Sequence, residues 1–313
     1  MVKGGVRYSA AGFHSLLVPI DLSPASDRVV GRVAQLPLAE GCRITLLHVI
    51  SMDLPVRDRK RAEVAARKVL RAEAQELGRQ LPRGVALQSV VAQGAAATEI
   101  ARYATSVKAE LVVMGRYGGS VLRDVFLGST AERVIRRGQL PVLAVRLRAR
   151  TPYRHPALAL DIDQAANESV AMLLRIIPPK RPPVTVIHAF DVPHYGMLNP
   201  GMSTDDAEEY NDEYREKALH EIAALLRKAL LRSKAGPDDA PIWKAHIRYG
   251  TPRLVIERTV RRTDTDLLVL GTRGRSGAAY LFLGTVAGDV LRNVACDVLV
   301  VPPRRQPARK KGR

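Results

Sequence analysis

The sequence predicts an α/β protein with two tandem open five-stranded parallel sheets, each carrying helices on both faces. Three observations predict this fold: a length of 313 residues, apolar runs that alternate with helical segments, and a motif that occurs twice. This length fits two domains of roughly 150 residues each. We therefore expect domain one at residues 1–150, domain two at residues 151–303, and a basic, disordered tail at residues 304–313.

Five short apolar runs in the first half are predicted strands. Segments of helical character separate them, and in the clearest of these, residues 57–81, Val64, Leu70 and Leu77 stand at helix-like offsets before Pro82. Continuous apolar strands that alternate with helices indicate a parallel sheet covered on both faces. The predicted strands are residues 16–20, 44–50, 85–91, 111–115 and 141–145.

The second half repeats the plan of the first. The run "ITLLHV" corresponds to "VTVIHA", which pairs His48 with His188, and Gly94 pairs with Gly250. The offset between the copies grows from 140–142 to 156 residues, so we expect an insertion in residues 191–214, as a loop that leads into a helix. The predicted strands of this half are residues 158–162, 184–190, 243–249, 267–271 and 298–301.

The repeated motif lies where such a sheet binds ligands. "GRYGGSVLRDVFLGST" begins at Gly115, and "GTRGRSGAAYLFLGTV" begins at Gly271. In the common strand order 3-2-1-4-5 the order reverses between strands one and four, and ligands bind outside the carboxyl ends of the strands at that reversal. The acids Asp21 and Asp163, which follow the first strands, would face these glycines across the crevice.

The chemistry of the motif suits a nucleotide. Glycine lets the backbone approach a ligand closely and expose its N–H groups. Gly128-Ser129 and Gly284-Thr285 open segments that are predicted helices, and a hydroxyl beside free amides at a helix N-terminus suits phosphate. An apolar slot could take a base, and the acid after strand one could bind ribose hydroxyls or the base edge.

Structural roles are the alternative for several of these residues. Asp21 could serve as a turn residue before a helix that Ser23 caps, with Pro24 at its first position. His48 and His188, on apolar strands, could be hydrogen-bonded core histidines. The sequence contains no GxxxxGK[ST] phosphate-binding loop and no Ser/His/Asp or Cys/His arrangement typical of a nucleophilic enzyme.

At these residues the chain resembles a tandem member of the universal stress protein family. The resemblance rests on the repeated G-xx-G-x9-G-[S/T] pattern, the acid after strand one, the "LLHV" second strand and the closing "PVLAV" strand. In the family this pattern marks the ATP-binding subclass, so the resemblance implies ATP as ligand, with Mg²⁺. It also implies that the two halves pair through their fifth strands as an internal pseudo-dimer.

The resemblance implies a set of binding residues in each copy. Asp161 stands where the first copy has Pro19, and Asp297 where it has Pro141. Asp161 and Asp163, two apart on a strand, would repel phosphate, an effect that Arg273 could offset. The first site is therefore the better match. Its residues are Pro19, Asp21, Val49, Met114, Gly115, Tyr117, Gly118, Gly128, Ser129 and Thr130. Those of the second are Asp163, Ala189, Leu270, Gly271, Arg273, Gly274, Gly284, Thr285 and Val286.

Charge and composition narrow the classes of function. The net charge of +18 is uneven: residues 1–150 carry 24 Lys and Arg against 12 Asp and Glu, whereas residues 151–303 carry 19 of each. Aromatic residues are only 4%, which disfavours nucleic-acid recognition by base stacking. No apolar run approaches the roughly 20 residues of a membrane span. The two cysteines, Cys42 and Cys296, lie far apart, which excludes a disulfide framework and predicts a cytoplasmic protein without a targeting signal.

These observations predict a stress-response regulator that binds ATP in one or both halves and uses nucleotide occupancy to switch its conformation or partner binding. At most weak hydrolysis of ATP is expected, because no general base accompanies the phosphate-binding motif. Two alternatives are a slow Mg²⁺-dependent ATPase and a binder of polyanions or nucleic acid through the basic first half and the tail. The expected partners are an adenine nucleotide, other proteins, and a second tandem chain in a homodimer.

Overall fold

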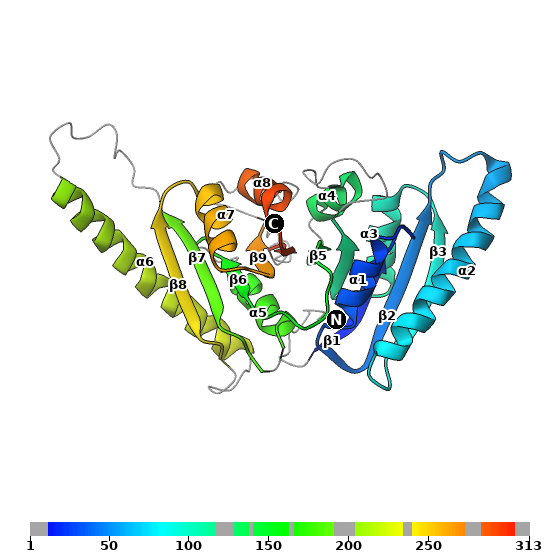
Figure 1. The fold of residues 1–313 in the computed structure, drawn as a ribbon, viewed down its shortest axis with the longest axis horizontal. Helices are drawn as coiled ribbons and strands as arrows, with labels where there is room; N and C mark the ends of the chain where they lie inside the picture. Colours follow the sequence, from blue (N-terminus) through cyan, green and yellow to red (C-terminus); the bar gives the residue numbers. More distant parts are fainter. Residues whose placement is uncertain are drawn as a thin grey trace, which may run out of the picture.

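The fold consists of two similar halves that share one sheet (Figure 1). The computed structural model describes residues 12–116, 128–137, 140–162, 166–178, 180–190, 204–233, 240–272 and 283–303.

The first half alternates strands and helices in the predicted order. Its first strand begins three residues earlier than predicted, at Phe13, and its second is longer than predicted, because it starts at Leu38. The elements of this half are β1 (Phe13–Pro19), α1 (Ser26–Val33), β2 (Leu38–Ile50), α2 (Val56–Gln80), β3 (Ala86–Gln93), α3 (Ala96–Ser106), β4 (Leu111–Gly115), α4 (Ser129–Arg136) and β5 (Val142–Val145).

The second half has the same succession of elements. Its second helix is the longest among the described residues. Of the predicted insertion, residues 191–214, residues 204–214 lie in this helix and residues 191–203 lie outside the described residues. The elements are β6 (Pro156–Ala159), α5 (Ala166–Ile176), β7 (Val184–Phe190), α6 (Thr204–Ser233), β8 (Trp243–Tyr249), α7 (Pro252–Arg262), β9 (Leu267–Gly271), α8 (Thr285–Asn293) and β10 (Asp297–Val301).

All ten strands form a single sheet in the order β3-β2-β1-β4-β5-β10-β9-β6-β7-β8. Within each half the strands are parallel and follow the predicted order 3-2-1-4-5. The halves meet where β5 and β10 pair antiparallel, with Leu143 opposite Leu299. The predicted pairing through the fifth strands is therefore confirmed.

Apolar side chains cover both faces of the sheet, which explains why its strands are apolar throughout. On β1, Leu16 and Val18 point into the core under α1, α2, α5 and α6, whereas Leu17 points into the core under α3, α4, α7 and α8. Each core runs across both halves, because each contains residues of β1 and β4 as well as β6 and β9. Successive side chains of a strand therefore point to opposite faces of the sheet, and both faces are buried.

The repeated glycines before the third helix of each half share a backbone conformation. Gly94 has a φ of +147° and Gly250 a φ of +133°, a region that residues with a side chain rarely adopt. Each N–H donates to the last carbonyl of the neighbouring second strand, of Ile50 at 3.0 Å and of Phe190 at 3.1 Å. The pairing of these two glycines in the sequence thus reflects one turn built twice.

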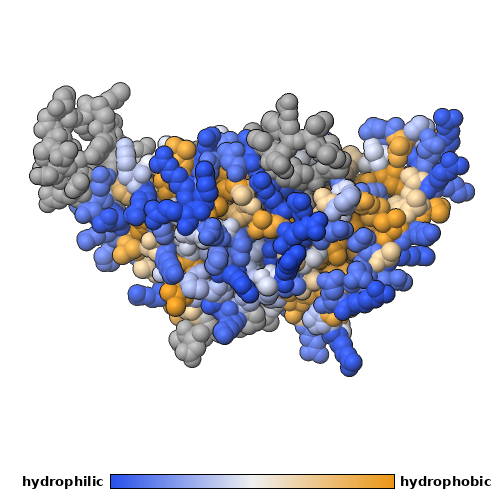
Figure 2. Space-filling model, viewed as in Figure 1, coloured by the Kyte–Doolittle hydropathy of each residue, from blue (hydrophilic) through white to orange (hydrophobic). Residues whose placement is uncertain are grey.

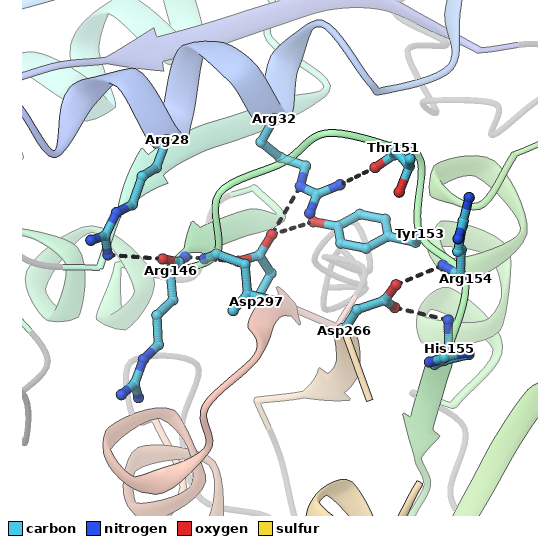
Figure 3. A network of polar contacts seen from close by, with 10 residues as sticks. Arg28, Arg32, Arg146, Thr151, Tyr153, Arg154, His155, Asp266 and Asp297 are labelled. Carbon is cyan, nitrogen blue, oxygen red and sulfur yellow. Dashed lines mark hydrogen bonds and ion pairs between the residues drawn. The ribbon is translucent and has the colours of Figure 1, made fainter. Parts of the chain in front are cut away.

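A buried carboxylate holds the two halves together (Figure 3). Asp297, at the start of β10, is fully buried, and its Oδ2 accepts hydrogen bonds from Arg32 Nε of α1 at 2.9 Å and from the Tyr153 hydroxyl at 2.9 Å. Its Oδ1 accepts the backbone N–H groups of Arg146 and Leu147 at 2.7 and 2.8 Å. Burial and the Asp297 carboxylate raise the pKa of Tyr153 well above its usual range, so the tyrosine remains the donor. Asp297 therefore lies where the two halves meet, a region that we call the joint.

A second ion pair crosses the joint in the opposite direction. Arg175 of α5 has a side chain that is 1% exposed and forms an ion pair with Glu110, the residue before β4. Its Nε and Nη2 also donate to the carbonyl of Gly12 at 3.1 and 3.0 Å, and its guanidinium lies 4.4 Å from the centre of the Phe13 ring. Each half thus contributes a buried arginine to an ion pair with the other half.

The two cysteines are buried, one in each half, and we expect neither thiol to react in the folded chain. Burial raises the pKa of both Cys42 and Cys296 to about 12, so the reactive thiolate is scarce at neutral pH. An alkylating reagent followed by intact mass should leave the native chain unmodified over a period in which two additions occur in urea. Addition to the native chain at the unfolded rate would contradict this prediction.

Candidate functional site

A cavity of about 240 Å³ lies at the carboxyl ends of β1 and β4, where the strand order of the first half reverses. In parallel sheets this is the usual place for a ligand. Six elements, β1, α1, β2, α3, β4 and α4, contribute to it, together with the loops that follow β1 and β4. The lining residues are Pro19, Ile20, Asp21, Ala25, Ser26, Val29, Leu47, His48, Val49, Ala96, Ile100, Met114, Gly115, Arg116, Gly128, Ser129, Thr130 and Ala131.

The acid after β1 has a defined position in the cavity wall. Asp21 Oδ1 accepts the N–H of Ser23 at 3.0 Å and the hydroxyl of Ser26 at 2.9 Å. Helix α1 begins at Ser26 with Ala25 before it, so the alternative in which Ser23 caps this helix is wrong. The reason is that Asp21 itself orders the turn, through the residues that precede and begin the helix.

The start of α4 is fixed beside the end of β4. The N–H of Gly128 donates to the carbonyl of Arg116 at 2.8 Å, and helix α4 follows at Ser129. The first N–H groups of a helix have no partner within the helix, and they make its N-terminus attractive to an anion. Gly128, Ser129 and Thr130 therefore bring amides and hydroxyls to the cavity, opposite Asp21.

Arg116 is a residue of the cavity that the sequence analysis did not identify. Its side chain is fully buried, and its Nη1 donates to the carbonyl of Val294, at the end of α8, at 2.5 Å. Arg146 Nη1 donates to the same carbonyl at 2.9 Å. Cations at a helix C-terminus are stabilising. The wall of the first cavity is thus hydrogen-bonded to the C-terminal end of α8 in the second half, a contact that no local pattern could reveal.

The two histidines of the second strands of each half make the same hydrogen bond. His48 Nδ1 lies 2.9 Å from the carbonyl of Ile20, and His188 Nδ1 lies 2.9 Å from the carbonyl of Leu160. Because a carbonyl only accepts, Nδ1 carries the hydrogen in both rings. His188 is buried, whereas His48 is half-buried and lines the cavity. The imidazoles therefore bind the backbone that follows the first strand of each half, and His48 also faces the cavity.

The structure brings together every described residue of the predicted first site. Pro19, Asp21 and Val49 lie on one side of the cavity, and residues from β4 and α4 on the other. The residues from β4 and α4 are Met114, Gly115, Gly128, Ser129 and Thr130. Tyr117 and Gly118 lie outside the described residues. The role of these residues in binding stays a prediction.

In the second half the two ends of the glycine motif are joined by a backbone hydrogen bond, as they are in the first half. The N–H of Gly284 donates to the carbonyl of Thr272 at 3.2 Å, and α8 begins at Thr285, as predicted. Leu270 and Gly271 end β9, and Ala189 lies near the end of β7; Val286 is the second residue of α8. Asp163, Arg273 and Gly274 lie outside the described residues.

The first strand of the second half is shorter than predicted. Strand β6 ends at Ala159, because its ladders with β7 and β9 end there, so Asp161 does not lie on a strand. Its Oδ1 accepts the N–H of Ile162 at 3.0 Å. The expectation that Asp161 and Asp163 share one face of a strand is therefore wrong.

The described residues contain neither a cluster of metal-binding side chains nor a membrane-spanning helix. No group of three His, Cys, Asp or Glu side chains there is arranged to hold a metal ion. Among the same residues, no helix has the length and apolar character needed to cross a membrane.

Comparison with known proteins gives a consistent result. The sequence model of the Universal stress protein family matches twice, at residues 12–146 and 153–302. Universal stress protein E of Escherichia coli K12 is 30% identical over 174 residues, which are 53% of this chain and 47% of that protein. The chain therefore matches about half the length of that relative. A universal stress protein of Mycolicibacterium smegmatis is 25% identical over 312 residues, 93% of this chain and 98% of the relative.

The fold is shared with solved structures. The crystal structure of a universal stress protein from Archaeoglobus fulgidus superposes with a TM-score of 0.64 at 19% identity, over 92% of this chain and 98% of that one. A putative universal stress protein from Pseudomonas aeruginosa gives a TM-score of 0.60 at 20% identity, over 94% and 95% of the two chains. At these identities the likeness shows the arrangement of elements.

Proposed function

Because the chain belongs to the universal stress protein family, we propose that it is a stress-response regulator that binds ATP in one or both halves and responds to nucleotide occupancy. In this proposal, binding alters the conformation of the chain or its choice of partner. We expect Mg²⁺ to enter with the nucleotide, because protein Mg²⁺ sites of this kind are completed by phosphate oxygens.

One observation carries the proposal: the cavity at the reversal of strand order has an acid at one side and a helix N-terminus at the other. Asp21 would accept hydrogen bonds from ribose hydroxyls, and the amides at Ser129 and Thr130 would bind phosphate. The apolar side chains of Val49 and Met114, which also line the cavity, offer a surface for the base.

The affinity would have to come from several contacts together. A helix N-terminus contributes only about 0.3–1 kcal/mol per favourable charge. Micromolar binding requires about 8 kcal/mol. Hydrogen bonds to charged groups contribute about 1.5–3 kcal/mol each, so a few such bonds to phosphate and one to Asp21 reach this range.

A regulatory role is supported by the contact that leaves the cavity wall. Arg116 lines the cavity in the first half and hydrogen-bonds the end of α8 in the second half. Phosphate beside the backbone of Arg116 would therefore lie next to a contact between the halves. Occupancy of the first cavity would act on the position of α8, whose N-terminus is the predicted phosphate site of the second half.

The proposal is tested by denaturing freshly purified protein, without added nucleotide, and counting the adenine nucleotides released per chain. Two per chain would support a filled site in each half, and one would support a single working site. The same protein stripped of nucleotide should then bind Mg-ATP in calorimetry. No release together with no binding of Mg-ATP would refute the proposal.

A further inference from the structure

The segment that joins the two halves carries only positive charge. Residues 133–160 contain seven arginines and neither aspartate nor glutamate. Four of these arginines fall between Arg146 and His155, in the connection from β5 to β6. The connection lies at the centre of the molecule, between the two halves (Figure 1), and the space-filling view shows hydrophilic side chains at the centre of this face (Figure 2).

The connection is held along helix α1 by contacts to its backbone (Figure 3). Arg28 Nη1 donates to the carbonyl of Arg146 at 3.1 Å, and Arg32 Nη1 donates to the carbonyl of Thr151 at 3.2 Å. Between them, a Cβ on Gly31 would lie 3.6 Å from the carbonyl of Ala149, so the connection contacts the helix at this small residue.

The carboxylates of the joint are engaged by the backbone of the connection. Asp297 accepts the N–H groups at its start, as described above, and Asp266 accepts those of Arg154 and His155, at 2.6 and 3.0 Å. Both ends of the connection are thereby fixed through its backbone. Arg146 directs its guanidinium to the carbonyl of Val294, whereas Arg148, Arg150 and Arg154 are exposed.

Four exposed arginines make up what we term the linker arginine cluster: Arg28, Arg148, Arg150 and Arg154. Within the described residues no hydrogen bond or ion pair involves the guanidinium groups of the last three. Two exposed acids accompany the cluster: Asp27 is next to Arg28 in the chain, and the carbonyl of Asp264 contacts His155. The cluster therefore keeps an excess of positive charge.

We propose that the linker arginine cluster binds the phosphate backbone of a nucleic-acid duplex. Arginine binds phosphate in a bidentate, planar manner, and residues 133–160 contain arginine but no lysine. A protein partner would need an apolar or aromatic anchor at the centre of the surface. Here the aromatic residue, Tyr153, is buried, and Leu147 and Ala149 are half-buried, so charge is what the surface offers.

A duplex fits this surface better than a single strand. Proteins that bind single strands without sequence preference stack bases on aromatic side chains, and Tyr153, the one Phe, Tyr or Trp among residues 146–155, is buried. Contacts to phosphates alone suffice for binding to a duplex, and they make that binding strongly dependent on salt. The cluster lies outside the nucleotide cavity, so the proposal does not rest on ATP binding.

The test uses the full chain and a fluorescent duplex of mixed sequence, with anisotropy measured over a series of salt concentrations. The variant R148A/R150A/R154A removes three charges of the cluster. The matched control, R57A/K60A/R61A, removes three exposed charges from the start of α2 in the first half. Both sets of side chains are on the surface, and thermal melts would establish that both variants fold.

The cluster variant is expected to bind at least about tenfold more weakly, with a salt dependence shallower by about two to three units of slope, whereas the control changes less than about twofold. Equal loss in both variants would overturn the proposal, because it would show only the effect of net charge. Absence of binding by the unaltered chain in low salt would also overturn it. So would tighter binding of a single strand or of polyglutamate than of the duplex.

Discussion

Replacing Asp297 with alanine is expected to lower the free energy of unfolding by about 3–5 kcal/mol. The change leaves the Arg32 guanidinium, with a side chain only 4% exposed, without its carboxylate partner. It also removes the acceptor of the Tyr153 hydroxyl and of two backbone N–H groups. Urea unfolding measures the loss directly, and a fall of roughly 10 °C in melting temperature should accompany it.

Two further variants separate the buried ion pair from the loss of a hydrogen-bond acceptor. Asp266→Ala also removes the acceptor of two linker N–H groups, but among the described residues Asp266 forms no ion pair with a guanidinium, so we expect a loss of only about 1–2 kcal/mol. Adding Arg32→Leu to Asp297→Ala should recover part of the stability, because the uncompensated buried charge is gone. If Asp297→Ala cost no more than Asp266→Ala, the central role of Asp297 in the joint would be contradicted.

The second large effect is expected at the nucleotide cavity, and it depends on the proposed function. Asp21→Ala should weaken the binding of Mg-ATP to the first half by about 10- to 100-fold, the equivalent of one charge-assisted hydrogen bond. The substitution removes the acceptor proposed for the ribose and also the acceptor of Ser23 N–H and the Ser26 hydroxyl. Calorimetry on nucleotide-stripped protein gives the affinity.

The control variants distinguish the charge of Asp21 from its effect on the turn. Asp21→Asn retains an oxygen that can accept from Ser23 and Ser26, so a loss seen with asparagine as well would be due to the missing charge. Asp27→Ala changes an exposed residue of helix α1 and should leave the affinity unchanged. ATP binding that survives Asp21→Ala at full strength would remove Asp21 from the proposed site.

The order of elements and the sheet topology could be predicted because they depend on patterns within short segments. Apolar runs of β-forming residues marked the strands, and their alternation with helices required a parallel sheet with both faces covered. Because the second half repeats the pattern of the first, its order of elements could be predicted in the same way. The site followed from the same logic, since the reversal of strand order brings Asp21 and Gly115 to one cavity.

The contacts across the joint could not be predicted, because they join residues far apart in the chain. Arg32 and Asp297 are 265 positions apart, and Arg116 and the carbonyl of Val294 are 178 apart. The sequence shows only that Asp297, in the second copy, stands at the position that corresponds to Pro141 in the first. Its burial beside an arginine of the other half depends on the packing of α1 on β4 and β5 and on the pairing of β5 with β10, which no local pattern contains.

The antiparallel pairing of β5 with β10 affects the association equilibrium of the two halves. Joined by a short connection, each half meets its partner at an effective concentration in the millimolar range, far above that of free domains in dilute solution. The pairing is therefore an intramolecular equilibrium that dilution does not disturb. It also brings together two halves with different sequences, so each can carry contacts, such as Arg32 with Asp297, that two identical copies would have to duplicate.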